Sequence, residues 1–337
     1  MAKRKRVPPV IRPGSRKPTT RWDEERRSQL LVMALGAAVV FAAAVIAIFG
    51  YYQTQVRPKG ETVLRVGNRS FSLDYFERRL RYDIREGNTT YATYSSQATT
   101  LLLNEIETEE LMRQGAPEKG VDLSDEAIDA EIRSQEDIPA DAGRNTFAAF
   151  YREAVRSSGL TTQGYRDVIA ANIAENAIQP IFEEEAPKTA DQVRFRVIVL
   201  TTEDAAKAAL DRLRNGEDFA TVASELSEHE ASRQQGGEQD WTPRGILEPV
   251  LDEALFSLEV GQFSDIITGE SQLYIVQVLE RQAQRETTDS QQSLLASQAQ
   301  QEWLGQLRDR VGVDTSMSDS QRNSILEVLQ SEVEKGQ

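Results

Sequence analysis

An uncharged stretch near the N-terminus constrains this chain more than any other feature. No Asp, Glu, Lys or Arg occurs between Arg27 and Arg57, and residues 30–51 read LLVMALGAAVVFAAAVIAIFGY. About 20 apolar residues in a helix match the thickness of a bilayer core, and a helix satisfies its own backbone hydrogen bonds there. Tyr51 and Tyr52 occupy positions typical of interfacial aromatics. We therefore expect residues 29–52 to be a single transmembrane anchor.

The charges that flank this stretch predict its orientation. Residues 1–28 hold ten Lys and Arg against three Asp and Glu, and we expect them to form a basic cytoplasmic tail. Because basic flanks stay in the cytoplasm, the bulk of the chain is expected outside it, in a single-pass protein of the cell membrane. A sharper interpretation has the tail bind lipid phosphates. A cleaved signal peptide is the main alternative, although its apolar core would span only about 7–15 residues.

Composition narrows the chemistry of the exterior part. The tail carries +7, and removing it from the total of −15 leaves −22 for the rest of the chain. Such acidity disfavours nucleic acid as a partner and keeps the exterior part soluble. The chain has no cysteine and one histidine, His229, which excludes disulfides and thiol catalysis and disfavours a catalytic zinc site. We expect no metal and no cofactor.

The exterior part divides into two patterns, so the expected fold class is α+β. Residues 62–187 are predicted to be mainly helical, after a strand–turn–strand around Gly67-Asn68 and a helix capped by Ser72. From residue 192 to 282 strands are predicted at 193–200, 263–268 and 273–279, with helices at 202–215, 218–226 and 248–257. Residues 283–337 form a C-terminal helical segment, either a free tail or one that packs on the first part.

Several motifs carry a resemblance to a known family. The run Asn-Gly-Glu-Asp-Phe-Ala at 215–220 is followed by Gly236-Gly237 and then by Arg244-Gly245. In this order they resemble a parvulin-type peptidyl-prolyl isomerase domain over residues 192–282. Residues 66–76 and 120–128 are similar to elements of the chaperone region of SurA-like and PrsA-like foldases. The resemblance implies a membrane-anchored foldase whose partners are unfolded or newly exported polypeptides.

The same resemblance implies site residues and departures from the family. The histidines of the family's first and last strands fall at Val197 and Tyr274, and its polar or thiol loop residue falls at His229. The implied catalytic residues are therefore His229 and Tyr274. The positions implied for substrate binding are Leu247, Leu251, Phe256 and Ser271.

Each of these residues also has a plainer interpretation. His229 is otherwise an exposed loop residue between two glutamates, and Tyr274 an ordinary strand aromatic. Phe256 is otherwise core, and Ser271 a turn residue. In the helical part, Phe147, Phe150 and Tyr151 are either core or the lining of a client groove.

Three functions stay open at this stage. Loss of both family histidines leaves either a weak isomerase or a peptide-binding domain that no longer catalyses. The second case corresponds to a holdase chaperone or a partner of the export machinery. A purely structural envelope protein is the third option, and the oligomeric state is open.

Overall fold

The computed structural model describes residues 33, 41, 43–47, 60–88, 90–139 and 141–336. The chain divides into two units after Glu61, and the second unit, Thr62–Gln337, holds almost all of the described residues. The expected tail and anchor lie outside the described residues, apart from residues 33, 41 and 43–47, which are helical. Within the described positions, no helix combines the length and apolar character needed to cross a membrane. The anchor at 29–52 stays a prediction.

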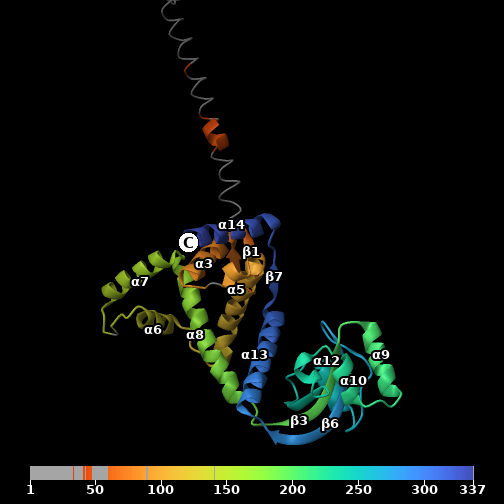
Figure 1. Ribbon diagram of the computed structural model, residues 1–337. Coiled ribbons are helices and arrows are strands. Elements are labelled where there is room, and N and C mark those ends of the chain that lie inside the picture. The colour runs from red at the N-terminus through yellow and green to blue at the C-terminus, as the bar shows by residue number, and fades with distance from the viewer. Residues whose placement is uncertain are drawn as a thin grey trace, which may run out of the picture. The chain divides into compact units, whose positions relative to one another are not determined.

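The second unit begins with two short strands and a series of helices (Figure 1). The predicted strand–turn–strand is confirmed, and Ser72 Oγ accepts a hydrogen bond from Tyr75 N at 3.4 Å, as predicted for the cap. The elements are β1 (Thr62–Val66), β2 (Arg69–Ser72), α3 (Leu73–Arg85), α4 (Thr90–Thr93), α5 (Ala98–Gly115), α6 (Asp125–Gln135), α7 (Arg144–Ser158) and α8 (Thr162–Glu185), with 3-10 turns at Ser95–Gln97 and Ala116–Lys119.

The C-terminal segment returns to pack on this helical part, which resolves the open alternative. It consists of α13 (Asp289–Val311), β7 (Val313–Thr315) and α14 (Asp319–Gly336). β7 pairs antiparallel with β1 to give a three-stranded sheet in the order β2-β1-β7. Ile325 of α14 is fully buried in one core with Phe76 and Leu80 of α3. The two ends of this unit thus complete one hydrophobic core.

An α+β part lies between α8 and α13 in the chain. Its strands form one antiparallel sheet in the order β4-β3-β6-β5. Alternation along the first strand gives the sheet two cores: Ile198 and Leu200 pack with the helices that follow it, and Val197 and Val199 pack with the helix before the sheet's edge strand. The elements are β3 (Thr189–Leu200), α9 (Glu203–Arg214), α10 (Phe219–Leu226), α11 (Glu230–Arg233), β4 (Glu238–Pro243), α12 (Pro249–Ser257), β5 (Ile267–Thr268) and β6 (Leu273–Glu286).

Three strand predictions need correction. Residues 238–243 form β4 where a polar loop was expected, because pairing with β3 and not an apolar pattern makes this edge strand. The strand predicted at 263–268 is regular only at Ile267–Thr268, with one isolated bridge at Phe263. β6 runs seven residues beyond its predicted end at 279, because β3 begins four residues before its predicted start and pairs with this extension, with Thr189 opposite Glu286. These polar extensions carry no periodic signal.

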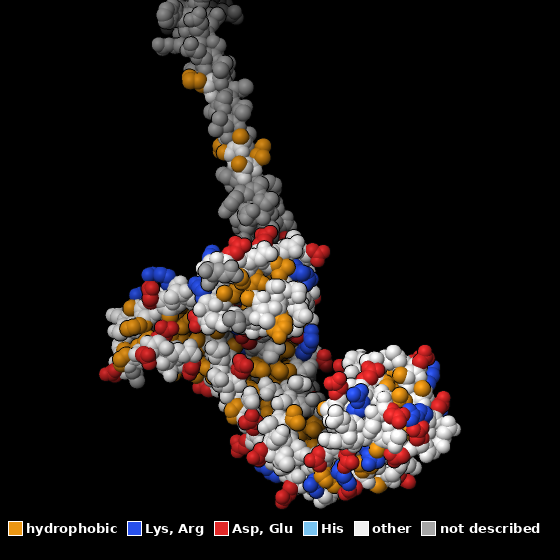
Figure 2. Space-filling view, in the orientation of Figure 1, with side chains coloured by type: hydrophobic (Ala, Val, Ile, Leu, Met, Phe, Trp, Pro, Cys, Tyr) orange, Lys and Arg blue, Asp and Glu red, His pale blue; other side chains and the backbone are white. Residues whose placement is uncertain are grey.

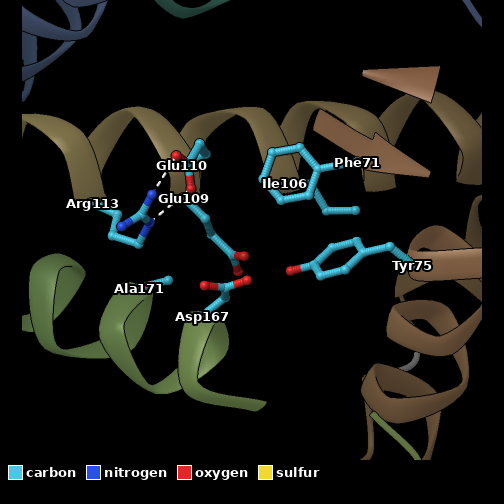
Figure 3. Close-up of a pocket in the computed structure, with 8 residues that line it drawn as sticks. All are labelled: Phe71, Tyr75, Ile106, Glu109, Glu110, Arg113, Asp167 and Ala171. Carbon is cyan, nitrogen blue, oxygen red and sulfur yellow. Dashed lines mark hydrogen bonds and ion pairs between the residues drawn. The ribbon is translucent and has the colours of Figure 1, made fainter. Parts of the chain in front are cut away.

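A buried polar network holds the helices of the first part together. Arg79 of α3 is 4% exposed and pairs with Asp83 at 2.7 Å and with Glu109 of α5 at 2.5 Å. Beside it lies a cavity of about 10 Å³, at the lower limit for one water molecule. Figure 3 shows the carboxylates of Glu109 and Asp167 and the Tyr75 hydroxyl pointing toward one another there. Each carboxylate is neutralised elsewhere, Glu109 by Arg79 and Asp167 by Arg69.

Asp83 gives this network a pH dependence. Burial raises the pKa of Asp83 to about 7, which outweighs the attraction of Arg79, and the negative charges of Glu105 and Glu109 act in the same direction as burial. Tyr91 also faces this carboxylate, with its hydroxyl 3.5 Å away. A folded-state pKa above the unfolded value means that the protonated form favours folding. The resulting stabilisation is complete below pH about 4 and is lost as the pH rises toward 7.

We predict that Asp83→Asn reduces this pH dependence. The difference in melting temperature, variant minus unchanged chain, should be larger at pH 7.5 than at pH 4.5, because asparagine mimics the protonated carboxyl. Thermal unfolding followed by circular dichroism measures this difference. Asp74→Asn, which removes a partly exposed partner of Arg78 on the same helix, is the matched control. A relative melting temperature that falls as the pH rises would contradict the prediction.

Candidate functional site

Most of the predicted site residues come together on one face of the α+β sheet. Leu251 and Tyr274 are buried in the core between α12 and the sheet, and Leu247 and Phe256 pack against the same cluster. Ser271 lies exposed in the turn before β6. His229 lies at the N-terminal end of α11, half-buried. The site is therefore built by α12, the end of β3 and the start of β6.

Tyr274 lies inside this cluster with its hydroxyl already engaged. It is 9% exposed and stands opposite Val199 in the β3–β6 ladder. The hydroxyl donates to Glu248 Oε1 at 3.0 Å. Burial raises the pKa of Tyr274 above its usual 10, and the hydrogen bond to Glu248 and the charges of Glu248 and Glu270 add to this. In this conformation the tyrosine proton points at Glu248, and the hydroxyl oxygen keeps only acceptor capacity.

Glu248 is a residue of this candidate site that sequence reasoning missed. It stands at the N-cap position of α12 without a side-chain capping bond, and its Oε2 accepts a hydrogen bond from Glu270 N at 3.3 Å. A Cβ on Gly269 would lie 2.5 Å from both Glu248 Oε2 and Tyr274 Cε2, so this close packing requires glycine. The only sequence signal was a charged residue between the predicted wall positions Leu247 and Leu251. Its partners come from a loop and a strand more than 20 residues away in the chain.

The loop that carries His229 is fastened to β3 at Val199. Ser227 Oγ accepts from Val199 N at 3.1 Å, and Glu228 N donates to Val199 O at 2.8 Å. The His229 ring Nδ1 lies 2.7 Å from Ser232 Oγ. The loop and Tyr274 thus lie beside the same strand residue. No hydrogen bond between the His229 and Tyr274 side chains occurs in the described part of the chain.

The Gly236-Gly237 pair allows two backbone segments to approach closely. Val197 N donates to Gly237 O at 2.9 Å, and a Cβ on Gly237 would lie 2.4 Å from Val197 O. Gly237 also has a φ of +79°, which favours glycine. Val197, where the resemblance places the family's first-strand histidine, is 7% exposed and belongs to the apolar cluster. This part of the site is a packed apolar wall.

Phe256 and Ser271 contribute differently. The guanidinium groups of Arg244 and Arg281 lie 5.1 Å and 5.8 Å from the centroid of the Phe256 ring. Arg281 also donates to the Leu255 and Leu258 carbonyl oxygens, which ties α12 to β6. Phe256 is partly buried against the cluster of α12 and the sheet. The exposed Ser271 borders the Glu248–Tyr274 pair through the turn that contains Gly269 and Glu270.

The arrangement is suited to chemistry without a nucleophile. Among the described residues, no group of three His, Cys, Asp or Glu side chains is placed to hold a metal ion. The site holds the partly buried Leu247 and the buried Leu251 beside a carboxylate and a hydroxyl. Rotation about an X–Pro bond has a barrier of about 18–20 kcal/mol that comes from amide resonance. A surface that favours the twisted amide is sufficient to lower it.

The helical part presents a second surface of interest on α7. Phe150 is largely exposed, and Phe147 and Tyr151 stack with ring centroids 5.9 Å apart. Both rings are partly buried against the core between α6 and α8. Figure 2 shows apolar side chains gathered on this side of the helical part, among scattered acidic ones. Phe147 and Tyr151 are therefore partly core, and Phe150 is available at the surface.

We predict that Gly237→Ala destabilises the fold much more than Gly216→Ala. Both glycines have positive φ, so alanine costs about 1–2 kcal/mol of backbone strain at either position. Only Gly237 has backbone atoms in the place of the new Cβ, since nothing lies within 4 Å of that place at Gly216. Urea unfolding of the two variants measures the difference, which overpacking should increase by about 1–3 kcal/mol. Equal losses in the free energy of unfolding would contradict the prediction and show that the loop around Gly237 accommodates the new Cβ without cost.

Comparisons with known proteins agree with this architecture. A family model described as the PPIC-type PPIASE domain matches residues 183–282, and one described as the SurA-like N-terminal domain matches residues 24–179. The resemblance drawn from the motifs is thereby confirmed.

Named relatives match over part of their length. The chain is 32% identical to the chaperone SurA of Methylobacillus flagellatus over 151 residues, which is 40% of this chain and 34% of that protein. It is 24% identical to the foldase protein PrsA of Caldanaerobacter subterraneus over 175 residues, 52% of this chain and 55% of that protein. The chain thus spans between a third and about half of these relatives.

Among solved structures, the solution structure of the parvulin domain of PpiD from E. coli is 34% identical in sequence. That match covers 29% of this chain and 93% of that domain, with a TM-score of 0.26. The two family matches show that this chain contains a SurA-like N-terminal domain followed by a PPIC-type peptidyl-prolyl isomerase domain.

Proposed function

We propose that this protein is a membrane-anchored extracytoplasmic foldase. Its isomerase domain catalyses cis–trans isomerisation of X–Pro bonds, and its helical part acts as a chaperone for newly exported proteins. One observation carries the proposal: a single chain combines a SurA-like N-terminal domain with a PPIC-type peptidyl-prolyl isomerase domain. The uncharged segment at 30–51 and its basic flank support the anchored arrangement.

The geometry of the isomerase domain supports activity on proline. Leu247 and Leu251 offer an apolar wall, which suits a proline ring. The Glu248–Tyr274 pair lies at the edge of that wall and presents oxygen atoms to a bound amide. Because uncatalysed X–Pro isomerisation takes tens to hundreds of seconds, a modest stabilisation of the twisted amide is useful to a folding chain.

Specific observations favour a second candidate, a holdase or export-machinery partner without catalysis. Val197 and Tyr274 stand where the family has histidines, and the Tyr274 hydroxyl donates to Glu248 instead of pointing at a substrate. Exposed Phe150 on α7 adds apolar surface that suits unfolded clients. In this case the isomerase domain binds proline segments and leaves the bond unchanged.

We predict that the purified chain accelerates cis-to-trans conversion of a short Leu-Pro peptide. The double variant His229→Ala, Tyr274→Phe should lose about threefold to tenfold of this acceleration, the value of one or two hydrogen bonds at the site. A protease-coupled or NMR exchange assay provides the rate. Tyr94→Phe, which alters an exposed tyrosine of the helical part, is the matched control.

The same preparation separates the two candidates. Suppression of aggregation of an unfolded client, with no acceleration of the peptide at micromolar protein, would replace the isomerase with the holdase. Acceleration that survives the double variant unchanged would place the catalytic groups elsewhere in the domain.

We predict that the N-terminus is cytoplasmic and that residues from about 56 onward lie outside the cytoplasm. Alkaline phosphatase fused after Gln337 should be active, since this enzyme requires export, and a fusion after Arg27 should be inactive. Protease added to intact spheroplasts should cleave the exterior part. A full-length fusion that is inactive and protected from protease would contradict the proposed localisation.

A further inference from the structure

Glu248 differs from the other semi-buried carboxylates of the isomerase domain because it lacks a cationic partner. Within residues 60–88, 90–139 and 141–336, no ion pair involves it. Arg244, four residues earlier, lies 3.6 Å from Asp252 and covers the Phe256 ring. By contrast, Glu238 is paired with Arg194. No described ion pair therefore neutralises the Glu248 carboxylate, and its charge is available to a ligand.

Two hydrogen bonds hold this carboxylate in a defined position. Oε1 accepts from the Tyr274 hydroxyl, and Oε2 accepts from the backbone of Glu270. A carboxylate oxygen has capacity for a further donor beside each of these bonds. A ligand cation would therefore meet a carboxylate that is already oriented, and little side-chain entropy is lost on binding.

The position of Glu248 connects this charge with the proline site. In the chain it lies between Leu247 and Leu251, the predicted wall residues, and in space it touches Tyr274 and the turn that carries Ser271. Exposed Glu270, in the turn that bonds to Glu248, adds a second negative charge, and the exposed Arg244 of the preceding loop is engaged by Asp252. Val250, the second residue of α12, is 44% exposed and offers apolar surface at the same helix end.

We propose that Glu248 is a specificity-determining residue that selects proline segments carrying lysine or arginine next to the proline. The inference rests on the proposed function of this site. The ammonium or guanidinium group pairs with the Glu248 carboxylate, and the aliphatic stem of the same side chain lies along the apolar rim. An acidic residue at the same substrate position is disfavoured by repulsion from Glu248 and the neighbouring Glu270.

The test compares peptides that differ only beside the proline. Two sets are used with the full-length chain, one with Arg, Leu or Glu immediately before the proline and one with the same residues immediately after it. Binding is measured by fluorescence anisotropy of labelled peptides, and isomerisation by NMR exchange. In at least one set, the arginine peptide should bind about threefold to tenfold more tightly than the leucine peptide, with the glutamate peptide weakest. This preference should shrink in 0.5 M NaCl.

Substitution then assigns the preference to Glu248. Glu248→Gln keeps an oxygen acceptor for the Tyr274 hydroxyl and removes the charge, so the arginine and leucine peptides should bind equally to it. Glu253→Gln removes the same charge from an exposed position of the same helix and should leave the preference intact. Circular dichroism melts of both variants establish that they are folded.

The outcomes separate this inference from the proposed function. Equal binding of all peptides in both sets, or an arginine preference that persists in Glu248→Gln, overturns the inference, even if every peptide is isomerised. An arginine preference that disappears in Glu248→Gln, with no peptide isomerised, supports the inference and removes catalysis from the proposed function. No measurable binding of the arginine peptides overturns the inference as well.

Discussion

The antiparallel pairing of β3 with β6 is the interaction on which the isomerase domain depends. It runs from Thr189 opposite Glu286 to Leu200 opposite Leu273, and brings together residues almost 100 positions apart at its open end. Because side chains alternate across a strand, this one register sends Ile198 and Leu200 to the α9 and α10 side, and Val197 and Val199 to the α12 side. It also sets Tyr274 opposite Val199, and so places the candidate site.

The buried and semi-buried carboxylates of this protein are of two kinds: some are paired with a cation, and one is held by hydrogen bonds alone. In the helical part, Asp83 and Glu109 both pair with the buried Arg79, and this pairing offsets only part of the desolvation cost of Asp83. In the isomerase domain, Glu248 is held by a hydroxyl and a backbone amide, and no cation offsets its charge in the described structure. A fixed, unneutralised charge beside apolar walls is a feature of binding sites more than of stable cores.

Sequence reasoning reached much of the site but not its central contact. The motif alignment led to Leu247, Leu251 and Tyr274, and the structure places all three in one cluster because α12 packs on the face that Tyr274 shares. It did not lead to Glu248, since the importance of this residue comes from the Tyr274 hydroxyl and the Glu270 amide. For the same reason β4 and β7 were missed, because each is a strand only through its pairing with a distant segment.

The sequence by itself determined the elements whose cause is local. The cap at Ser72 and the apolar spacing of the helices are readable because each depends on neighbouring residues alone. Only the tertiary structure decided that β7 and α14 return to close the first core, and that a tyrosine and a glutamate meet over Gly269. Those contacts join segments far apart in the chain, and no local pattern of residue types encodes which distant partner a segment finds.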